Sequence, residues 1–452
     1  MSRGVVAAGH PLTAETGAAV LREGGNAVDA AVAAVLASFV TESPLTGLGA
    51  GGYMLVHTRE ETALLDFFVA VPGGAERSSE LVPVPVYFTP ETPQVFHIGA
   101  ASCGVPGTPA GLELAVKRYG SVPLADLAEP AARIAREGHE VLPEHAYFLA
   151  ILGPILTRYA EGAEIYAPAG RLPGVGDRFR FEELGDAIER FGAEGSAPFY
   201  TGDIAAALSD WVLERGGTLG REDLAAYEPV VREPVHAHFS GRDVFTNPPP
   251  SSGGILIAYA LALLERLDGT GLDNVVAAME AAQLARTEAF LDGLYSDGFA
   301  QSFLEPDRIA AAAERLAERG GAGDGPLPAD DPLGSTTHIT AVDREGRCAS
   351  VTCSNGTGSG LLVPGTGVHI NNMLGEEDLN PHGFHRHTAG RRMPSMMSPT
   401  VVLRDGQLEA GLGSGGSNRI RSAILQTVLR LLSDEVPVDE AVVAPPAHYE
   451  AG

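Results

Sequence analysis

The sequence has few of the features that mark disulfide-bonded, metal-binding or membrane-spanning proteins. Its 452 residues contain only Cys103, Cys348 and Cys353, whose spacing fits neither a disulfide framework nor a zinc pattern, so we expect a reducing compartment. The longest unbroken apolar run, residues 30–37, is far shorter than the ~18 residues of a transmembrane helix. The first residues show no basic segment followed by an apolar one, which predicts no signal peptide and a cytoplasmic protein.

Basic residues are scarce, and lysine is nearly absent. The chain has 58 acidic and 31 basic residues, a net charge of −27, and Lys117 is its single lysine. Nucleic acids and anionic membranes bind basic surfaces, so this charge argues against both as partners. Hydrophobic residues make up 44% and charged residues 20% of the chain, which is typical of a globular protein with a large core.

Helical patterns dominate the first three quarters of the chain, and strand patterns dominate the last quarter. Residues 13–40 predict two helices broken at Gly24-Gly25, with Asn26 as N-cap of the second. Further helices are expected at residues 109–119, 124–137, 204–215, 255–267, 274–291, 308–319 and 418–432. Strands are expected at residues 47–58, 61–68, 235–246, 336–342, 347–354, 367–372, 399–403 and 408–412. This partial segregation predicts layered sheets with helices outside.

A possible self-cleavage point lies where a linker meets a strand. Residues 320–335 are rich in Gly, Pro and Asp and have no buryable face, so they predict a flexible linker. The strand that follows begins with Thr336 and Thr337. A threonine at a new N-terminus carries both a hydroxyl nucleophile and an α-amine that can act as its base. An ordinary strand start, which often carries β-branched residues, explains the same letters.

Another candidate is the glycine-rich segment at residues 411–420, between a predicted strand and a predicted helix. Glycines there let the backbone come close to a ligand and expose N–H groups at a helix N-terminus, which suits an oxyanion or a phosphate. The spacing matches neither the dinucleotide-binding nor the Walker pattern, and a tight turn is the structural alternative. Histidines 382, 385 and 387 fit no standard zinc pattern, and the acidic run at 376–378 is typical of a solvated face, so no metal or other cofactor is predicted.

Eight short motifs follow one another along nearly the whole chain. They are GGNAVDAAVA, GLGAGGYMLVH, VPGTPAG, PPPSSGG, TTHITAVD, NNMLGEED, MMSPT and GSGGSNRI. In this order they resemble the γ-glutamyltranspeptidase (glutathione hydrolase) family. The resemblance implies an α+β fold, a four-layer αββα sandwich of the N-terminal-nucleophile hydrolase type. It also implies self-cleavage between Ser335 and Thr336 into a large segment, 1–335, and a small segment, 336–452, that stay associated as one αββα domain.

The resemblance also implies roles for individual residues. Thr336 would be the nucleophile, Ser354 the second hydroxyl beside it, and the amides of Gly416 and Ser417 the oxyanion hole. The residues implied in substrate binding are Arg77, Asn355, Glu376 and Ser395, with Arg391 and Arg392 as alternatives to Arg77 for a carboxylate. An arginine suits that task because its guanidinium can bind a carboxylate with two parallel hydrogen bonds. The implied substrate is a small γ-glutamyl or related amide, and the acceptor is water or an amino-acid amine.

The chain departs from the family pattern around the glutamyl group rather than at the nucleophile. Glu376 stands where the family has Asp, Met373 where many members have Gln, and Met396 where the family has a second Ser. These changes leave three hypotheses open. The first is a γ-glutamyltransferase, the second is a cephalosporin-acylase-like amidase for a less polar acyl group, and the third is an uncleaved scaffold or binding protein without activity.

Overall fold

The structure of the chain is a computed structural model that describes residues 4–449 except 75–78, 90–91, 268 and 320–335. The predicted linker at 320–335, the predicted cleavage residue Ser335 and the predicted carboxylate-binding Arg77 therefore lie outside the described residues. All three cysteines are buried and free. None of the helices in the described part of the chain is both long and apolar enough to cross a membrane.

The larger sheet has six antiparallel strands in the order β1-β11-β12-β2-β3-β8. In chain order these strands are β1 (Gly4–Ala7), β2 (Gly51–His57), β3 (Thr62–Phe67), β8 (Val230–Arg232), β11 (Thr337–Asp343) and β12 (Cys348–Ser354). Every residue of β2 and β12 is buried, because both faces of the sheet centre are covered. The strand that follows Thr336, β11, therefore lies inside the molecule, between β1 and β12.

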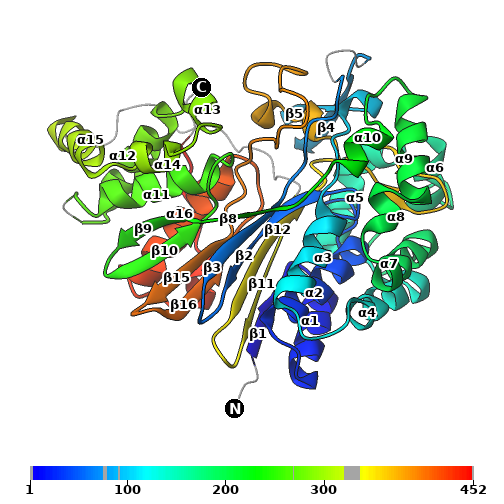
Figure 1. The fold of residues 1–452 in the computed structure, drawn as a ribbon, viewed down its shortest axis with the longest axis horizontal. Helices are drawn as coiled ribbons and strands as arrows, with labels where there is room; N and C mark the ends of the chain where they lie inside the picture. Colours follow the sequence, from blue (N-terminus) through cyan, green and yellow to red (C-terminus); the bar gives the residue numbers. More distant parts are fainter. Residues whose placement is uncertain (1–3, 75–78, 90–91, 268, 320–335, 450–452) are drawn as a thin grey trace.

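The smaller sheet has four antiparallel strands in the order β16-β15-β10-β9. They are β9 (Val235–Phe239), β10 (Arg242–Thr246), β15 (Thr400–Arg404) and β16 (Gln407–Leu412). This sheet lies against the larger one (Figure 1), with β16 in contact with β11 and β12. At the junction, the Ser350 hydroxyl of β12 donates a hydrogen bond to the Leu412 carbonyl of β16 over 3.1 Å.

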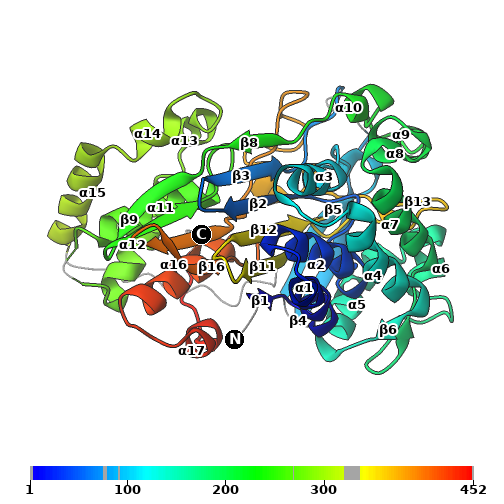
Figure 2. The ribbon, with the colours of Figure 1, turned by 60° about the horizontal axis from the view of Figure 1, so that its bottom comes forward.

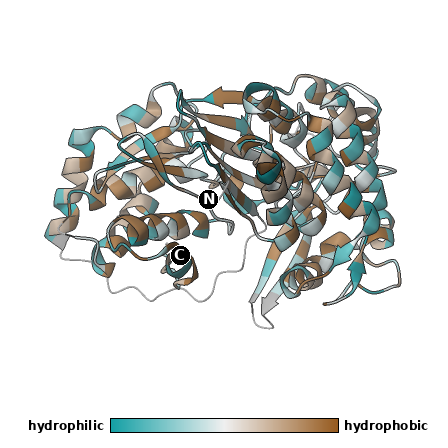
Figure 3. Ribbon diagram, turned by 90° about the horizontal axis from the view of Figure 1, so that it is seen from below, coloured by the Kyte–Doolittle hydropathy of each residue, from teal (hydrophilic) through white to brown (hydrophobic). Residues whose placement is uncertain are grey.

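Helices cover the outer face of each sheet, as Figures 1 and 2 show. The layer on the larger sheet includes α1 (Pro11–Glu23), α2 (Ala27–Thr41), α3 (Thr108–Tyr119), α4 (Leu124–Glu137) and α7 (Glu182–Glu194). The layer on the smaller sheet includes α11 (Gly253–Leu264), α12 (Leu272–Leu284), α15 (Pro306–Arg319) and α16 (Arg419–Leu432). Hydrophobic residues concentrate along the sheets and on the helix faces turned toward them (Figure 3). The predicted αββα sandwich is confirmed.

The remaining elements surround these layers. They are β4 (Val82–Thr89), β5 (Thr92–Ile98), β6 (His139–Glu140), α5 (Pro143–Leu156), α6 (Ala160–Tyr166), β7 (Arg178–Phe179), α8 (Ala197–Tyr200), α9 (Asp203–Leu213), α10 (Arg221–Ala225), α13 (Glu288–Gly293), α14 (Phe299–Phe303), β13 (Leu362–Val363), β14 (Val368–His369) and α17 (Val438–Val443). Of these, the β4–β5 hairpin contributes a wall of the candidate site.

Of two helix predictions that the structure tests, one is confirmed at its N-cap and the other is wrong. Asn26 caps α2 as predicted, accepting from the amides of Val28 and Asp29 while the Asp29 carboxylate accepts from the Asn26 amide. The single helix predicted at residues 274–291 is wrong, because the chain breaks after α12 and restarts at α13 with Thr287 as its N-cap. A local N-cap thus starts a new helix where periodicity alone predicts one continuous helix.

Candidate active site

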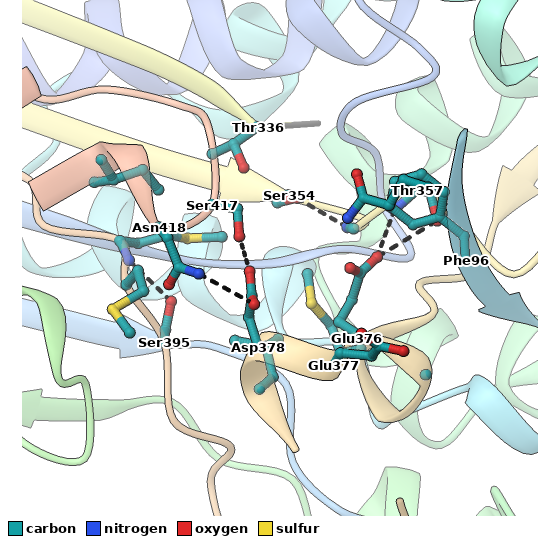
Figure 4. A pocket seen from close by; sticks show the side chains of 18 of the residues that line it. Phe96, Thr336, Ser354, Thr357, Glu376, Glu377, Asp378, Ser395, Ser417 and Asn418 are labelled. Atoms are coloured by element: carbon teal, nitrogen blue, oxygen red, sulfur yellow. Dashed lines mark hydrogen bonds between the residues drawn. The ribbon is translucent and has the colours of Figure 1, made fainter. Parts of the chain in front are cut away.

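One pocket brings together Thr336, Ser354, Glu376, Ser395 and Ser417, all named by the sequence (Figure 4). They come from separate segments of the chain: the start of β11, the end of β12, the residue between two 3-10 turns (Met373–Gly375 and Glu377–Leu379), the loop before β15, and the loop before α16. Gly416, the other predicted oxyanion amide, is the neighbour of Ser417 in that loop. The fold therefore assembles most of the predicted site in one place.

Thr336 stands directly before β11, half-buried, with its side chain at the pocket (Figure 4). Side chains alternate along a strand, so the buried Thr337 points to the opposite face. There its hydroxyl donates to the Glu42 carboxylate over 3.1 Å, and burial raises the pKa of Glu42 to about 7. The bond from Thr337 to Glu42 thus fixes which of the two threonines faces the pocket.

The glycine-rich loop after β16 packs directly on the strand that Thr336 begins. A Cβ atom added to Gly415 would lie 2.5 Å from the Thr336 carbonyl oxygen, and one added to Gly413 would lie 2.2 Å from the His338 ring. Glycine is therefore required at both positions by close backbone approach. Beyond them Gly416 has φ of 118° and Ser417 has φ of 50°, immediately before α16. The loop thus brings the predicted oxyanion residues Gly416 and Ser417 to the N-terminus of α16, next to the Gly415 that packs on Thr336.

The half-buried His338 is hydrogen-bonded within the larger sheet, two residues after Thr336. Its two ring nitrogens each lie 2.9 Å from a threonine hydroxyl, of Thr352 on β12 and of Thr340 on β11. Burial lowers the pKa of His338 to about 3, so the ring is neutral near pH 7. Its contacts with β12 and with Gly413 make it a spacer between the two sheets.

Ser354 ends β12 and Asn355 follows it, but the two side chains face different surroundings. The Ser354 hydroxyl oxygen lies at the pocket and accepts a hydrogen bond from the Gly356 amide over 2.8 Å. Asn355 is fully buried behind it, and its side-chain nitrogen is the nearest atom to a Cβ added at Gly47, at 3.3 Å. Neither side-chain atom of Asn355 has a hydrogen-bond partner among the described residues. Its assignment to substrate binding stays a prediction.

An acidic wall, which we define as Glu376, Glu377 and Asp378, lies across the pocket from Thr336 (Figure 4). The Glu376 carboxylate accepts from the Thr357 amide over 3.1 Å, and burial raises the pKa of Glu376 to about 7. The Glu377 side chain is 72% exposed. The wall is therefore only partly the solvated face that its acidic run predicted, because Glu376 and Asp378 have partners inside the site.

Asp378 was missed by the assignment of roles from the sequence. One of its carboxylate oxygens accepts a hydrogen bond from the Ser417 hydroxyl, and the other accepts from the Asn418 side-chain amide over 3.2 Å. It thereby ties the acidic wall to the loop of the predicted oxyanion amides. The acidic run was visible in the sequence, but its partners lie about forty residues later in the chain.

The floor of the pocket is apolar. It includes Phe68, Met373 and Met396, all nearly fully buried, and the Phe68 ring stacks on Tyr53 with centroids 5.3 Å apart. The neighbouring Ser395 hydroxyl accepts from the Met397 amide over 3.0 Å. The two methionines that replace polar family residues thus lie in the pocket itself.

The loop that carries Ser395 is held by the PPPSSGG segment. The Ser395 carbonyl accepts from the Ser252 amide and from the Ser251 hydroxyl, each over 2.8 Å. This segment leads directly into α11, so the helix layer of the smaller sheet positions that side of the pocket.

The two alternative arginines are engaged elsewhere. Arg392 lies 4.5 Å above the Tyr227 ring, 3.3 Å from the buried Asp66 carboxylate, and donates to the Phe68 carbonyl over 2.9 Å. The Arg391 guanidinium lies 4.1 Å above the Tyr295 ring. Neither is among the residues that line the pocket, and their role as alternative carboxylate ligands stays a prediction.

No group of three or more His, Cys, Asp or Glu side chains in the described residues is arranged to hold a metal ion. The polar groups of the described site are hydroxyls, carboxylates and backbone amides, beside an apolar floor.

The αββα layering is the fold of the N-terminal-nucleophile hydrolases. A γ-glutamyltranspeptidase family model matches residues 13–451. The chain is 32% identical to the glutathione hydrolase proenzyme of Escherichia coli (strain K12), over 99% of this chain and 81% of the relative. The chain belongs to the γ-glutamyltranspeptidase family.

Acylases are similar to this chain as well. The acylase ACY 1 proenzyme of Pseudomonas sp. (strain V22) is 30% identical over 100% of this chain and 83% of the relative. The crystal structure of cephalosporin acylase from Bacillus halodurans superposes with a TM-score of 0.82, at 25% identity, over 96% of this chain and 81% of that one. Family membership therefore leaves both a glutathione hydrolase and an acylase as models for the activity.

Proposed function

We propose that this protein cuts its own chain between Ser335 and Thr336 and then hydrolyses or transfers the acyl group of γ-glutamyl or related amides through an ester on Thr336. The carrying observation is the position of Thr336 at the pocket end of β11, against the Gly415 backbone and opposite Ser354. The relatives are proenzymes by name, which supports a processing step.

Self-cleavage would proceed as an acyl shift followed by hydrolysis. The Thr336 hydroxyl oxygen attacks the Ser335 carbonyl carbon, a C–O ester bond forms, the C–N peptide bond breaks, and the hydroxyl proton passes to the released amine. Water then hydrolyses the ester and leaves a carboxylate on Ser335. Thr336 thereby gains a free hydroxyl and a free α-amine, whose ordinary pKa of ~7.7–8 suits a base near neutral pH.

Turnover would use the same hydroxyl on a substrate. The Thr336 oxygen attacks the amide carbonyl, its proton passes to the α-amine and then to the leaving amine, and an acyl ester remains. Water releases the acid, or an amino-acid amine takes the acyl group. The Gly416 and Ser417 amides would stabilise the oxyanion, a contact worth about 3–4 kcal/mol per donor. Glu376 and Ser395 would contact the acyl group, with Arg77 and Asn355 as further predicted ligands; no metal or other cofactor is required.

An acylase acting on a less polar acyl group is the second candidate. The observation that favours it is the placement of Met373 and Met396 in the pocket floor beside Phe68. Buried thioethers and an aromatic ring favour apolar groups and offer no charged partner to a carboxylate.

A denaturing gel of the purified protein, with N-terminal sequencing of the fragments, tests the shared part of both candidates. We expect two fragments, the smaller beginning at Thr336, and release of an anilide from an acyl anilide substrate. Thr336→Ala should stay uncut and inactive, whereas Thr336→Ser should retain slow cleavage and slow turnover, because it keeps a hydroxyl nucleophile.

An uncut parent chain without anilide hydrolysis would reject the proposal and favour the non-enzymatic scaffold. Cleavage at another bond, or equal turnover in the parent and Thr336→Ala, would reject Thr336 as the nucleophile. Intact mass after overnight incubation separates slow cleavage from none.

A further inference from the structure

Helix α2 is hydrogen-bonded at both of its ends to β11, the strand that follows Thr336. At the pocket end, the Thr337 hydroxyl donates to the carboxylate of Glu42, the C-cap of α2, over 3.1 Å. At the far end, the Asp343 carboxylate accepts from the amide of Ala27, the first residue of α2, over 3.2 Å. Because the helix also packs on the strand between these two bonds, it fixes where the strand lies.

The end of α2 is an unfavourable place for an acidic residue. The C-terminus of a helix carries a partial negative charge, which disfavours a carboxylate there. Burial adds to this, and it is the largest cause that raises the pKa of Glu42 to about 7. Hydrogen-bond donors offset such costs, and Glu42 has hydroxyl donors from two different elements, Thr337 of β11 and Thr13 of α1.

The surroundings of Glu42 are fitted to its carboxylate. The oxygen that is not bonded to Thr337 accepts from the Thr13 hydroxyl over 3.4 Å, and the Thr13 oxygen lies 2.7 Å from the Thr41 hydroxyl oxygen of α2. A Cβ atom added to Gly9, just before α1, would lie 2.8 Å from the carboxylate. Glu42 therefore connects two helices of the outer layer to the first residue of β11.

This connection ends one residue from the candidate nucleophile. Thr337 is buried and pairs with Cys353 of β12, so its side chain and its backbone are both held. Glu42 lies outside the described pocket lining and cannot act on a substrate there directly. We propose that Glu42 is a positioning residue for Thr336: by holding Thr337 from the helix layer, it sets where the Thr336 hydroxyl stands at the pocket. The inference rests on the proposed chemistry at Thr336.

Removing either partner of this bond should slow both steps that use the Thr336 hydroxyl. We expect Glu42→Ala and Thr337→Val each to slow self-cleavage and to lower kcat, per molecule of cut chain, by about 10- to 100-fold with little change in KM. The reason is that a displaced nucleophile impairs the reaction more than it impairs substrate binding. Time courses on denaturing gels measure cleavage, and hydrolysis of an acyl anilide measures kcat and KM.

Combined and conservative variants show whether the bond itself is responsible. The double variant, Glu42→Ala with Thr337→Val, should lose no more activity than the worse single variant, because both changes break one contact. Glu42→Gln keeps an acceptor oxygen and Thr337→Ser keeps a donor hydroxyl. Both should therefore retain most of the cleavage rate and of kcat.

The chain offers a matched control in Asp343→Ala, which removes the bond between the same helix and strand at the far end. It should lower stability toward urea but leave cleavage and kcat near those of the parent. The reason is distance, because the seven residues of β11 place Asp343 roughly 20 Å from Thr336.

The outcomes separate this inference from the proposed function. If the parent is cut and active, the inference is overturned when Glu42→Ala and Thr337→Val match the parent, lose no more activity than Asp343→Ala, or change KM alone; amide hydrolysis at Thr336 then stands. Conservative variants as slow as Glu42→Ala and Thr337→Val would also overturn it. If Glu42→Ala does not fold, Thr337→Val and Thr337→Ser decide by themselves. An uncut and inert parent rejects the proposed function and this inference with it.

Discussion

Ser417 has a left-handed backbone conformation, with φ of 50°, that residues with side chains rarely adopt. Such a conformation costs about 1–3 kcal/mol and persists where the surroundings enforce it. Here the Ser417 hydroxyl and the Asn418 amide both bond to the Asp378 carboxylate. At the residue scale, Asp378 is therefore the group best placed to hold the predicted oxyanion amides in position.

Replacing Asp378 should impair turnover more than substrate binding. We expect Asp378→Ala to lower kcat for the best anilide by about 10- to 100-fold with little change in KM, because a misplaced oxyanion donor acts on the transition state. Asp378→Asn, which keeps an acceptor oxygen for Ser417, should retain more activity. Asp439→Ala, an exposed aspartate on α17, is the control. The test is steady-state kinetics of the variants, compared at temperatures where all of them remain folded. An unchanged kcat for Asp378→Ala would reject a positioning role for Asp378.

The positions of single residues at the pocket were predictable where a motif names them, and pairings with distant partners were not. Thr336, Ser354, Glu376 and Ser395 lie at the pocket as expected. The ion pair between Arg392 and Asp66 joins residues more than three hundred positions apart in the sequence. No local sequence pattern predicts such a pairing.

At the element scale, the loop between β16 and α16 joins the two halves of the site. It leaves the smaller sheet, touches the backbone of Thr336 and begins the helix that packs beside α11. Its glycines predicted that the backbone comes close to another group, but the sequence was compatible with both an anion site and a tight turn. The contact of Gly415 with Thr336 gives that approach its target.

A methyl group at Gly415 should disturb this contact. We expect Gly415→Ala to lose self-cleavage and to be destabilised by about 1–3 kcal/mol, because its Cβ would lie 2.5 Å from the Thr336 carbonyl oxygen. Gly271→Ala, at an open position with nothing within 4 Å, should cleave normally. Denaturing gels and urea unfolding of both variants provide the comparison. Normal cleavage of Gly415→Ala would contradict the prediction and show that the loop can shift to accommodate the methyl group.

At the scale of the whole molecule, the predicted large and small segments share both sheets. Strands β11 and β12 of the small segment lie between β1 and β2 of the large one, and β15 pairs with β10. Cutting one peptide bond leaves these ladders and the cores they cover in place. The two fragments would therefore be halves of one folded unit.

Cleavage should therefore not change the size of the native protein in solution. We expect the cut protein to elute from size-exclusion chromatography as one species containing both fragments, and to unfold in a single transition, because neither fragment keeps a complete sheet. The uncut Thr336→Ala variant should elute at the same volume. Separation of the fragments without denaturant, or two unfolding transitions that follow the two fragments, would contradict this.

The sequence by itself determined the layers, the family and the nucleophile candidate, because strand alternation, helix caps and the ordered motifs are local properties of the chain. It did not reveal β1, which completes the sheet beside β11, or the β4–β5 hairpin, which lines the pocket. Only the tertiary structure decided that Thr336 lies at the pocket while Thr337 bonds Glu42, that Asp378 bonds the loop of the predicted oxyanion amides, and that the described pocket lining carries no cation. These are relations between segments far apart in sequence, and they exist only once the two sheets have packed.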